Sequence, residues 1–144
     1  MMGCQSMKME FDARSENEEF ARVVTAVFMS RLNPTLEEID DVKTAVSEAV
    51  TNAVIHGYQG KEGTICLKLS AEEGENRRLF VSVQDQGVGI ADIKQAMEPM
   101  FTTDPSGERS GMGFSFMEAF MDEMKVESEP GKGTRVFMTK YIGR

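Results

Sequence analysis

The chain has 144 residues, of which 40% are hydrophobic, and it carries a formal net charge of −8 at pH 7. This size and apolar content predict a single domain, 1–144, with one core and a short disordered tail over 1–6. The negative charge disfavours direct binding to nucleic acid, whose backbone is also negative. No apolar run approaches the roughly 18 residues that cross a bilayer, and no secretory signal opens the chain, so we expect a cytoplasmic protein without membrane contact.

The first third of the chain predicts one strand and two helices. Apolar and polar residues alternate over 7–12, as in a half-buried strand. Apolar residues then recur at helical spacing in two runs, and each run opens with a capping-box pattern, S-E-N-E from Ser15 and T-L-E-E from Thr35. Asn33-Pro34 separates the two helices, and Gly57 suits a left-handed cap at the end of the second.

The middle of the chain predicts a hairpin and then an irregular segment. Alternation over 64–69 and 79–83 indicates two strands joined by a polar loop. Asp92 should cap a brief helix, and 97–113 shows no period, which predicts a mobile loop. The two cysteines, Cys4 and Cys66, lack the spacing of a disulfide framework or a metal site and are predicted to be reduced thiols.

The last third predicts one more helix and a second pair of strands. Apolar residues at helical spacing over 114–124 indicate the helix, in which we interpret the methionines as core filling: Met117, Met121 and Met124. Val126 should begin a strand, PGKG forms a turn, and 136–141 is the last strand. Helices and strands come in runs without strict alternation. This order predicts an α+β fold, a two-layer sandwich in which helices cover one face of a mixed, mostly antiparallel sheet.

The second predicted helix carries a possible chemical site. Glu48 and Asn52 are spaced to lie on one helix face, one turn apart. An amide oxygen suits Mg2+, and a carboxylate can accept a proton from an attacking hydroxyl. The alternative is that both residues are simply solvated, as polar residues on amphipathic helices usually are.

Two glycine-containing segments are further candidates. Asp85-Gln86-Gly87-Val88-Gly89-Ile90 follows a strand, where glycines allow close approach to a flat ligand and the carboxylate can accept a hydrogen bond from an adenine amine. An ordinary glycine turn explains the same pattern. Arg109-Ser110-Gly111-Met112-Gly113 leads into a helix, whose N-terminus can bind a phosphate, although Arg109 alone is more often a surface charge.

Four segments together resemble a known superfamily. SEAVTNAVIHGY, DQGVGI, RSGMGF and GKGT occur in the order of the nucleotide-binding boxes of the GHKL ATPases, which include gyrase, Hsp90, MutL and the histidine kinases. With FARVVTAVFMSRLNPT, MFTTDP and FMDEMKVESEPGKGT, the chain is similar to the sporulation anti-sigma F factors over nearly its whole length from Met9.

The resemblance implies a role for each matching residue. Glu48 would be the general base, Asn52 the Mg2+ ligand, and Asp85 the acceptor of the adenine amine. The segment 97–110 would be the ATP lid. The remaining residues implied to bind ATP are Gly87, Gly89, Thr103, Arg109, Ser110, Gly111, Met112, Gly113 and Thr134. His56 is the only histidine, and we interpret it as structural because it would lie in the last turn of the second helix.

The resemblance also implies the activity and the partners. The family sequesters sigma F, a sporulation sigma factor, from RNA polymerase and uses Mg-ATP to phosphorylate a serine of the anti-anti-sigma factor. Arg22 matches an arginine at the sigma-factor interface, and the family suggests a homodimer. Two alternatives stay open: a stress-response anti-sigma kinase that acts on another sigma factor, and a nucleotide-dependent binding module without phosphotransfer. A carboxylate at Glu48 favours the kinase, since a site that only binds has no need of a base beside the phosphates.

Overall fold

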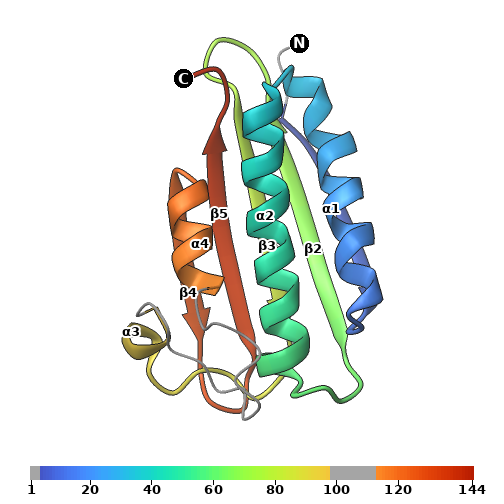
Figure 1. The fold of residues 1–144 in the computed structure, drawn as a ribbon, viewed down its shortest axis with the longest axis vertical. Helices are drawn as coiled ribbons and strands as arrows, with labels where there is room; N and C mark the ends of the chain where they lie inside the picture. The colour runs from blue at the N-terminus through green and yellow to red at the C-terminus, as the bar shows by residue number, and fades with distance from the viewer. Residues whose placement is uncertain (1–3, 98–112) are drawn as a thin grey trace.

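A computed structural model describes residues 4–97 and 113–144 and shows a sheet covered on one face by helices (Figure 1). The order of elements confirms the predicted α+β class, with two layers. The strands are β1 (Cys4–Asp12), β2 (Thr64–Glu72), β3 (Arg78–Asp85), β4 (Glu123–Ser128) and β5 (Thr134–Tyr141). The helices are α1 (Glu16–Met29), α2 (Leu36–Asn52), α3 (Ile93–Ala96) and α4 (Gly113–Phe120), with a 3-10 turn at Ser30–Leu32 and a π turn at Ala53–Gly57.

The five strands pair in the order β1-β2-β3-β5-β4, and each of these pairs is antiparallel. The predicted hairpin of β2 and β3 is confirmed. The predicted tail over 1–6 is wrong for residues 4–6, because β1 begins at Cys4 and pairs with β2 along its full length. The hydroxyls of Ser6 and Ser70 also lie 2.9 Å apart across this pair. Because residues 4–6 do not alternate apolar with polar side chains, the sequence pattern does not predict this part of the strand.

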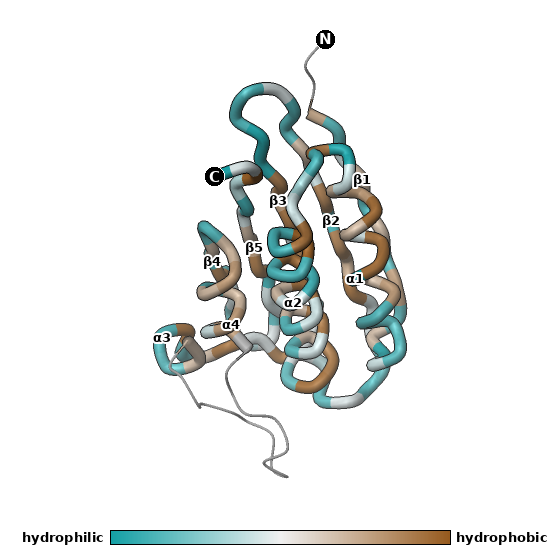
Figure 2. Tube along the Cα trace, turned by 45° about the horizontal axis from the view of Figure 1, so that its top comes forward, coloured by the Kyte–Doolittle hydropathy of each residue, from teal (hydrophilic) through white to brown (hydrophobic). Residues whose placement is uncertain are grey.

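The core lies between the sheet and the helices. Alternate residues of β2 and β3 are buried, among them Ile65, Leu67, Val81 and Val83. The hydrophobic side of α2 packs onto this face, and the stripe predicted for that helix is confirmed, since Ala45, Val46, Ala49, Val50 and Ala53 are at most 3% exposed. Figure 2 shows the apolar residues of the strands lying beneath the helices. Burial of this stripe is what fixes α2, and therefore Glu48 and Asn52, over the sheet.

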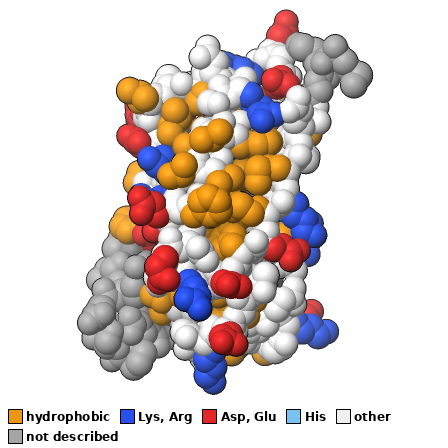
Figure 3. Space-filling model, turned by 90° about the vertical axis from the view of Figure 1, so that its right-hand side faces the viewer, with side chains coloured by type: hydrophobic (Ala, Val, Ile, Leu, Met, Phe, Trp, Pro, Cys, Tyr) orange, Lys and Arg blue, Asp and Glu red, His pale blue; other side chains and the backbone are white. Residues whose placement is uncertain are grey.

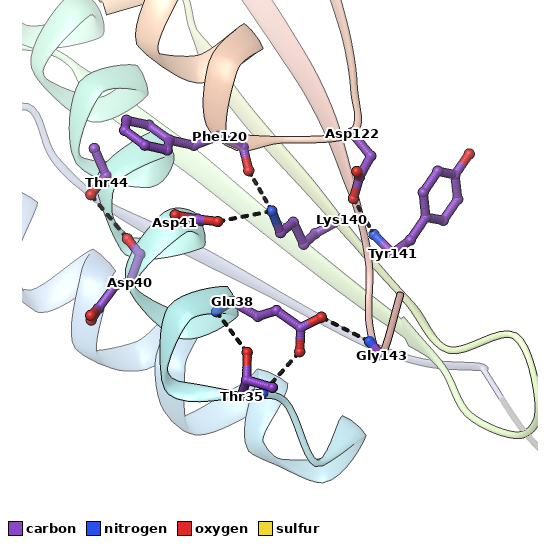
Figure 4. A network of polar contacts seen from close by, with 10 residues as sticks. All are labelled: Thr35, Glu38, Asp40, Asp41, Thr44, Phe120, Asp122, Lys140, Tyr141 and Gly143. Atoms are coloured by element: carbon purple, nitrogen blue, oxygen red, sulfur yellow. Dashed lines mark hydrogen bonds and ion pairs between the residues drawn. The ribbon is translucent and has the colours of Figure 1, made fainter.

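The start of α2 has the capping box that the sequence predicts. The Thr35 hydroxyl accepts a hydrogen bond from the Glu38 amide at 3.1 Å, and the Thr35 amide donates to the Glu38 carboxylate at 2.8 Å. The same carboxylate accepts from the Gly143 amide at 2.8 Å (Figure 4). Beside it, the Lys140 ammonium bridges Asp41 of α2 and the carbonyl oxygen of Phe120 at the end of α4. These contacts hold α2, α4 and the end of β5 together.

The start of α1 differs from the prediction. Ser15 has helical backbone angles and makes no side-chain cap, whereas the Asn17 side chain donates to the Asp12 carbonyl at 2.8 Å. The side chain of Glu18, which the capping box would have used, instead accepts from the Ser47 hydroxyl of α2. The hydrogen bond from Ser47 on α2 to Glu18 therefore forms in place of the predicted capping box at Ser15.

Two further boundaries correct the sequence analysis. The predicted helix over 114–124 ends at Phe120, and Met124 lies in β4, which begins at Glu123 instead of Val126. Met117 and Met121 are buried as core filling, and Met124 packs against the core from the strand. Gly57 does not adopt the predicted left-handed conformation. Positive φ angles occur just after it, at Gln59 and Gly60.

Within the described part of the chain, no helix has both the length and the apolar character to cross a membrane.

Candidate nucleotide site

Three connecting segments meet at the end of the sheet where α2 and β3 end and β5 begins (Figure 1). They are the π turn after α2, the loop that follows β3, and the turn between β4 and β5. The Val88 amide donates to the Gly57 carbonyl at 2.9 Å, and the Gly131 amide donates to the Val88 carbonyl at 2.7 Å. Backbone hydrogen bonds therefore join three segments that the sequence analysis had identified separately.

The glycines at this end let the three segments touch. A Cβ on Gly87 would lie 2.0 Å from the Gly57 carbonyl oxygen, and one on Gly89 would lie 2.0 Å from the Glu129 carbonyl oxygen. Real Cβ atoms do not approach so closely, so a side chain at either position would push the loops apart. Gly89 also has φ of +76°, which glycine adopts without strain. The glycines of DQGVGI are thus required by loop packing as well as by any ligand.

Asp85 is the buried acceptor of the site. It is 5% exposed, and its Oδ1 accepts from the Gly87 amide at 2.9 Å. Burial raises the pKa of this carboxyl, while backbone hydrogen bonds from Gly87 and Thr134 act in the opposite direction by stabilising the charged form. Gly57 leaves the space that the carboxylate occupies, because a Cβ there would lie 2.8 Å from the Asp85 Cγ. A buried carboxylate at the end of a strand can accept a hydrogen bond from the amine of an adenine ring.

Glu48 and Asn52 lie in the last part of α2, half-buried, and Asn52 is the final residue before the π turn. Such turns are rare and frequently occur at functional sites. Among the described residues, no three His, Cys, Asp or Glu side chains form a group that could hold a metal ion. Magnesium that shares phosphate oxygens and keeps several waters needs only one or two protein oxygens, so Asn52 fits this role.

The phosphate end of the predicted site is described only in part. Gly113 is the first residue of α4, and helix N-termini present backbone amides to anions. Thr103, Arg109, Ser110, Gly111 and Met112 lie outside the described residues, as does the predicted lid beyond Met97.

Thr134 is brought beside Asp85 by the sheet register. The two residues pair across β3 and β5, and Thr134 also pairs with Ser128 across β4 and β5. Ser128 was missed by the sequence analysis, although its place opposite Thr134 in the second hairpin was a usable signal. Tyr58 was missed as well. Its hydroxyl accepts from the Gln86 amide at 2.7 Å and donates to the Thr64 carbonyl at 2.6 Å, which holds the start of the DQGVGI loop.

Arg22 lies on α1, half-buried, with its Nε 3.1 Å from a carboxylate oxygen of Glu18. Since Glu18 also accepts from Ser47, the residue that precedes Glu48, Arg22 is linked by two side chains to the helix that carries the candidate base.

Comparison with known proteins gives consistent matches over nearly the whole chain. The family described as Histidine kinase-like ATPase domain matches residues 11–140. A Clostridium acetobutylicum protein named anti-sigma F factor is 60% identical over 136 residues, which cover 93% of this chain and 92% of the relative. Proteins of the same name from Clostridium kluyveri and Geobacillus kaustophilus are 56% and 52% identical, covering 95% and 96% of this chain and 94% and 93% of the relatives.

Solved structures show the same fold at low identity. The RsbU and RsbW domains of a Mycobacterium tuberculosis protein superpose with a TM-score of 0.64 at 21% identity, covering 97% of this chain and 33% of that chain. The mycobacterial sensor histidine kinase MprB gives a TM-score of 0.57 at 15% identity, covering 94% of this chain and 98% of that chain. These likenesses confirm the predicted two-layer sandwich fold.

Proposed function

The chain belongs to the anti-sigma F factor family, within the histidine kinase-like ATPase domains, and we propose that it is an anti-sigma factor with protein kinase activity. It holds sigma F away from RNA polymerase, and it phosphorylates a serine of the anti-anti-sigma factor with Mg-ATP in the cytoplasm. The observation that carries the proposal is 60% identity to an anti-sigma F factor over 93% of the chain. The local geometry supports it, because three of the four predicted nucleotide segments meet at one end of the sheet.

The site residues that the structure describes have two kinds of role: some bind Mg-ATP, and one accepts a proton. We assign the adenine amine to buried Asp85, which accepts a hydrogen bond from it, and the phosphates to the N-terminus of α4 at Gly113. Asn52 would hold Mg2+, which would neutralise charge on the phosphate oxygens. The serine hydroxyl of the partner forms a bond to the γ-phosphorus as ADP leaves, and Glu48 accepts the hydroxyl proton. Most of the rate then comes from positioning and charge stabilisation.

The partner surface that we propose includes α1 and β1. Phe20, Val23 and Val27 are 54%, 50% and 67% exposed, at spacings that place them along one side of α1. Figure 3 shows hydrophobic side chains gathered on the side of the molecule that bears α1 and β1. Large exposed apolar patches mark interaction sites. We assign this surface to a homodimer, with Arg22 of the same helix contacting the sigma factor.

The decisive experiment incubates the chain and a purified anti-anti-sigma factor with ATP labelled in the γ-phosphate. The unaltered chain should label the partner on serine. Glu48→Gln should lower the transfer rate by about a hundredfold or more, because it removes a general base. Mg-ATP affinity should be kept, since the amide preserves the shape of the side chain. Glu37→Gln, an exposed residue in the first turn of α2, is the matched control and should transfer normally.

The outcomes separate the alternatives. Nucleotide binding without any labelling of the partner would indicate a binding module and refute the kinase. Normal transfer by the Glu48→Gln variant would remove Glu48 from the role of base. Labelling of the partner by a chain that, in a separate binding assay, binds a sigma factor other than sigma F would indicate the stress-response type.

A further inference from the structure

Ser128, the last residue of β4, lies at the junction of the loops that surround Asp85. Its Oγ is 2.7 Å from the Ile90 amide nitrogen, 2.8 Å from the Gly133 carbonyl oxygen and 2.9 Å from the Thr134 Oγ1. These three groups come from the loop after β3, from the turn between β4 and β5, and from β5 itself. A single hydroxyl therefore ties together segments that would surround one purine ring.

The chemistry of the three partners determines the direction of each hydrogen bond. A serine hydroxyl has one proton to donate and two lone pairs to accept with. The Ile90 amide can only donate, and the Gly133 carbonyl can only accept. The Ser128 hydroxyl therefore donates its proton to the Gly133 carbonyl, and one of its lone pairs accepts from the Ile90 amide. The second lone pair remains for Thr134, so the hydroxyl of Thr134 must donate to Ser128.

This arrangement leaves Thr134 as an acceptor toward a ligand. Its one hydroxyl proton is directed at Ser128, and what remains at Oγ1 is lone-pair density. Asp85 is paired with Thr134 across the strands, and its carboxylate is an acceptor too. Asp85, Thr134 and Ser128 thus form a row across β3, β5 and β4, in which the first two present acceptors.

We propose that Ser128 is a specificity-determining residue that holds the Thr134 hydroxyl in the acceptor orientation, so that the site binds 6-aminopurines and rejects 6-oxopurines. The proposal rests on the nucleotide-binding function proposed above. An adenine amine donates a hydrogen bond and matches a row of acceptors. The 6-oxo group of hypoxanthine or guanine is itself an acceptor, and it would need a donor that Thr134 cannot supply while its proton is bound to Ser128. Ser128 acts through Thr134 and is a positioning residue.

The test compares the affinities of the chain for Mg-ATP and Mg-ITP by titration, because ITP carries a 6-oxo group in place of the 6-amino group, together with a proton on N1. Ser128→Ala frees the Thr134 hydroxyl to rotate and donate. The ratio of the two affinities should then fall by about tenfold, which is the scale of one neutral hydrogen bond. Ser82→Ala is the matched control, since Ser82 is a half-buried serine of β3 whose side chain alternates with the core-facing ones. That variant should keep the original ratio.

A double-mutant cycle shows whether the effect passes through Thr134. In a Thr134→Val background the hydroxyl is absent, so adding Ser128→Ala should leave the ratio unchanged. Ser128→Thr and Ser128→Val form a second pair of equal shape that differs only in the hydroxyl, which serves if the alanine variant folds poorly. The Ser128→Thr variant should keep a stronger preference for ATP over ITP than the Ser128→Val variant.

The results separate this proposal from the one on which it rests. An unaltered chain that binds no Mg-ATP would refute the nucleotide function itself. An unaltered chain that prefers ATP, together with a folded Ser128→Ala variant of the same preference, would overturn only the role of Ser128. The role of Ser128 would also be overturned if Ser128→Ala lowered the ratio of ATP to ITP affinity equally in the unaltered chain and in the Thr134→Val background.

Discussion

Gly131 and Gly133 form a matched pair for testing whether the loops of the nucleotide site must touch. Both lie in the turn between β4 and β5 with left-handed backbones, φ +79° and +83°. A Cβ at Gly133 would lie 2.1 Å from the Asp85 carbonyl oxygen, whereas one at Gly131 would meet no described atom within 4 Å. Alanine at either position therefore has the same backbone strain, and only alanine at Gly133 also collides with the loop after β3.

The two costs can be estimated separately. A left-handed conformation destabilises an alanine by about 1–2 kcal/mol, so Gly131→Ala should lower the free energy of unfolding by about that amount. Gly133→Ala must also move backbone from 2.1 Å to the 3.4 Å of ordinary contact. Forced repacking of this kind costs about 1–3 kcal/mol more. We expect a total loss of about 2–5 kcal/mol for Gly133→Ala.

The collision should also weaken nucleotide binding, because it displaces the segment that carries Asp85. A misplacement of about 1 Å in a site is enough to lower function by roughly tenfold to a hundredfold. Urea unfolding gives the two stabilities, and titration with Mg-ATP gives the two affinities. Gly131→Ala should bind normally and Gly133→Ala at least about tenfold more weakly. If both variants lose the same stability and bind ATP equally well, the close contact between the loops has no role in the site.

Three further predictions concern α1 and α2. Asn52→Ala should remove most of the gain in ATP affinity that magnesium provides, because a metal ligand is lost. Titrations of this variant with ATP in magnesium and in EDTA should then give similar affinities. Arg22→Glu should weaken sigma-factor binding by about a hundredfold or more and leave ATP binding unchanged, measured by a binding assay with circular dichroism as the check on folding. Parallel loss of helical signal would show that Arg22 supports the fold through its ion pair with Glu18. Burial alone would raise the pKa of Glu38, but hydrogen bonds from Thr35 and Gly143 outweigh it, and the pKa lies below its ordinary value of 4.5. The resulting stability is complete above that value and is lost as the pH falls through the folded pKa. Unfolding free energies at about pH 6 and about pH 3 should therefore differ more for the unaltered chain than for Glu38→Gln, and equal differences would contradict this.

The elements whose signals are local can be predicted from the sequence alone. The buried stripe of α2 recurs at helical spacing, and its capping box involves Thr35 and Glu38 only three residues apart. The hairpin of β2 and β3 is visible as two alternating runs around one loop. Each of these signals is contained within a few turns or one hairpin, so it can be recognised without knowledge of the rest of the chain.

The same locality explains the wrong boundaries. Ser15 begins a capping-box pattern, yet Glu18 bonds to Ser47 on another helix, and the cap does not form. Met124 continues a helical period, yet it lies in β4, where its neighbours pair with β5. In both cases a contact with another part of the chain determines the structure, and the local helical preference is not followed.

The construction of the candidate site depends on contacts that form only in the folded chain. Gly87 must lack a side chain because its backbone meets that of Gly57, and Gly57 must lack one because the Asp85 carboxylate occupies the space beside it. Nothing near these residues in the sequence predicts either contact. The hydrogen bond from Ile90 to Ser128 joins residues 38 positions apart, and it orients the Thr134 hydroxyl beside Asp85. The sequence identified which segments carry glycines and acidic residues. The directions in which their hydrogen bonds run follow from contacts that exist only after the sheet has brought those segments together.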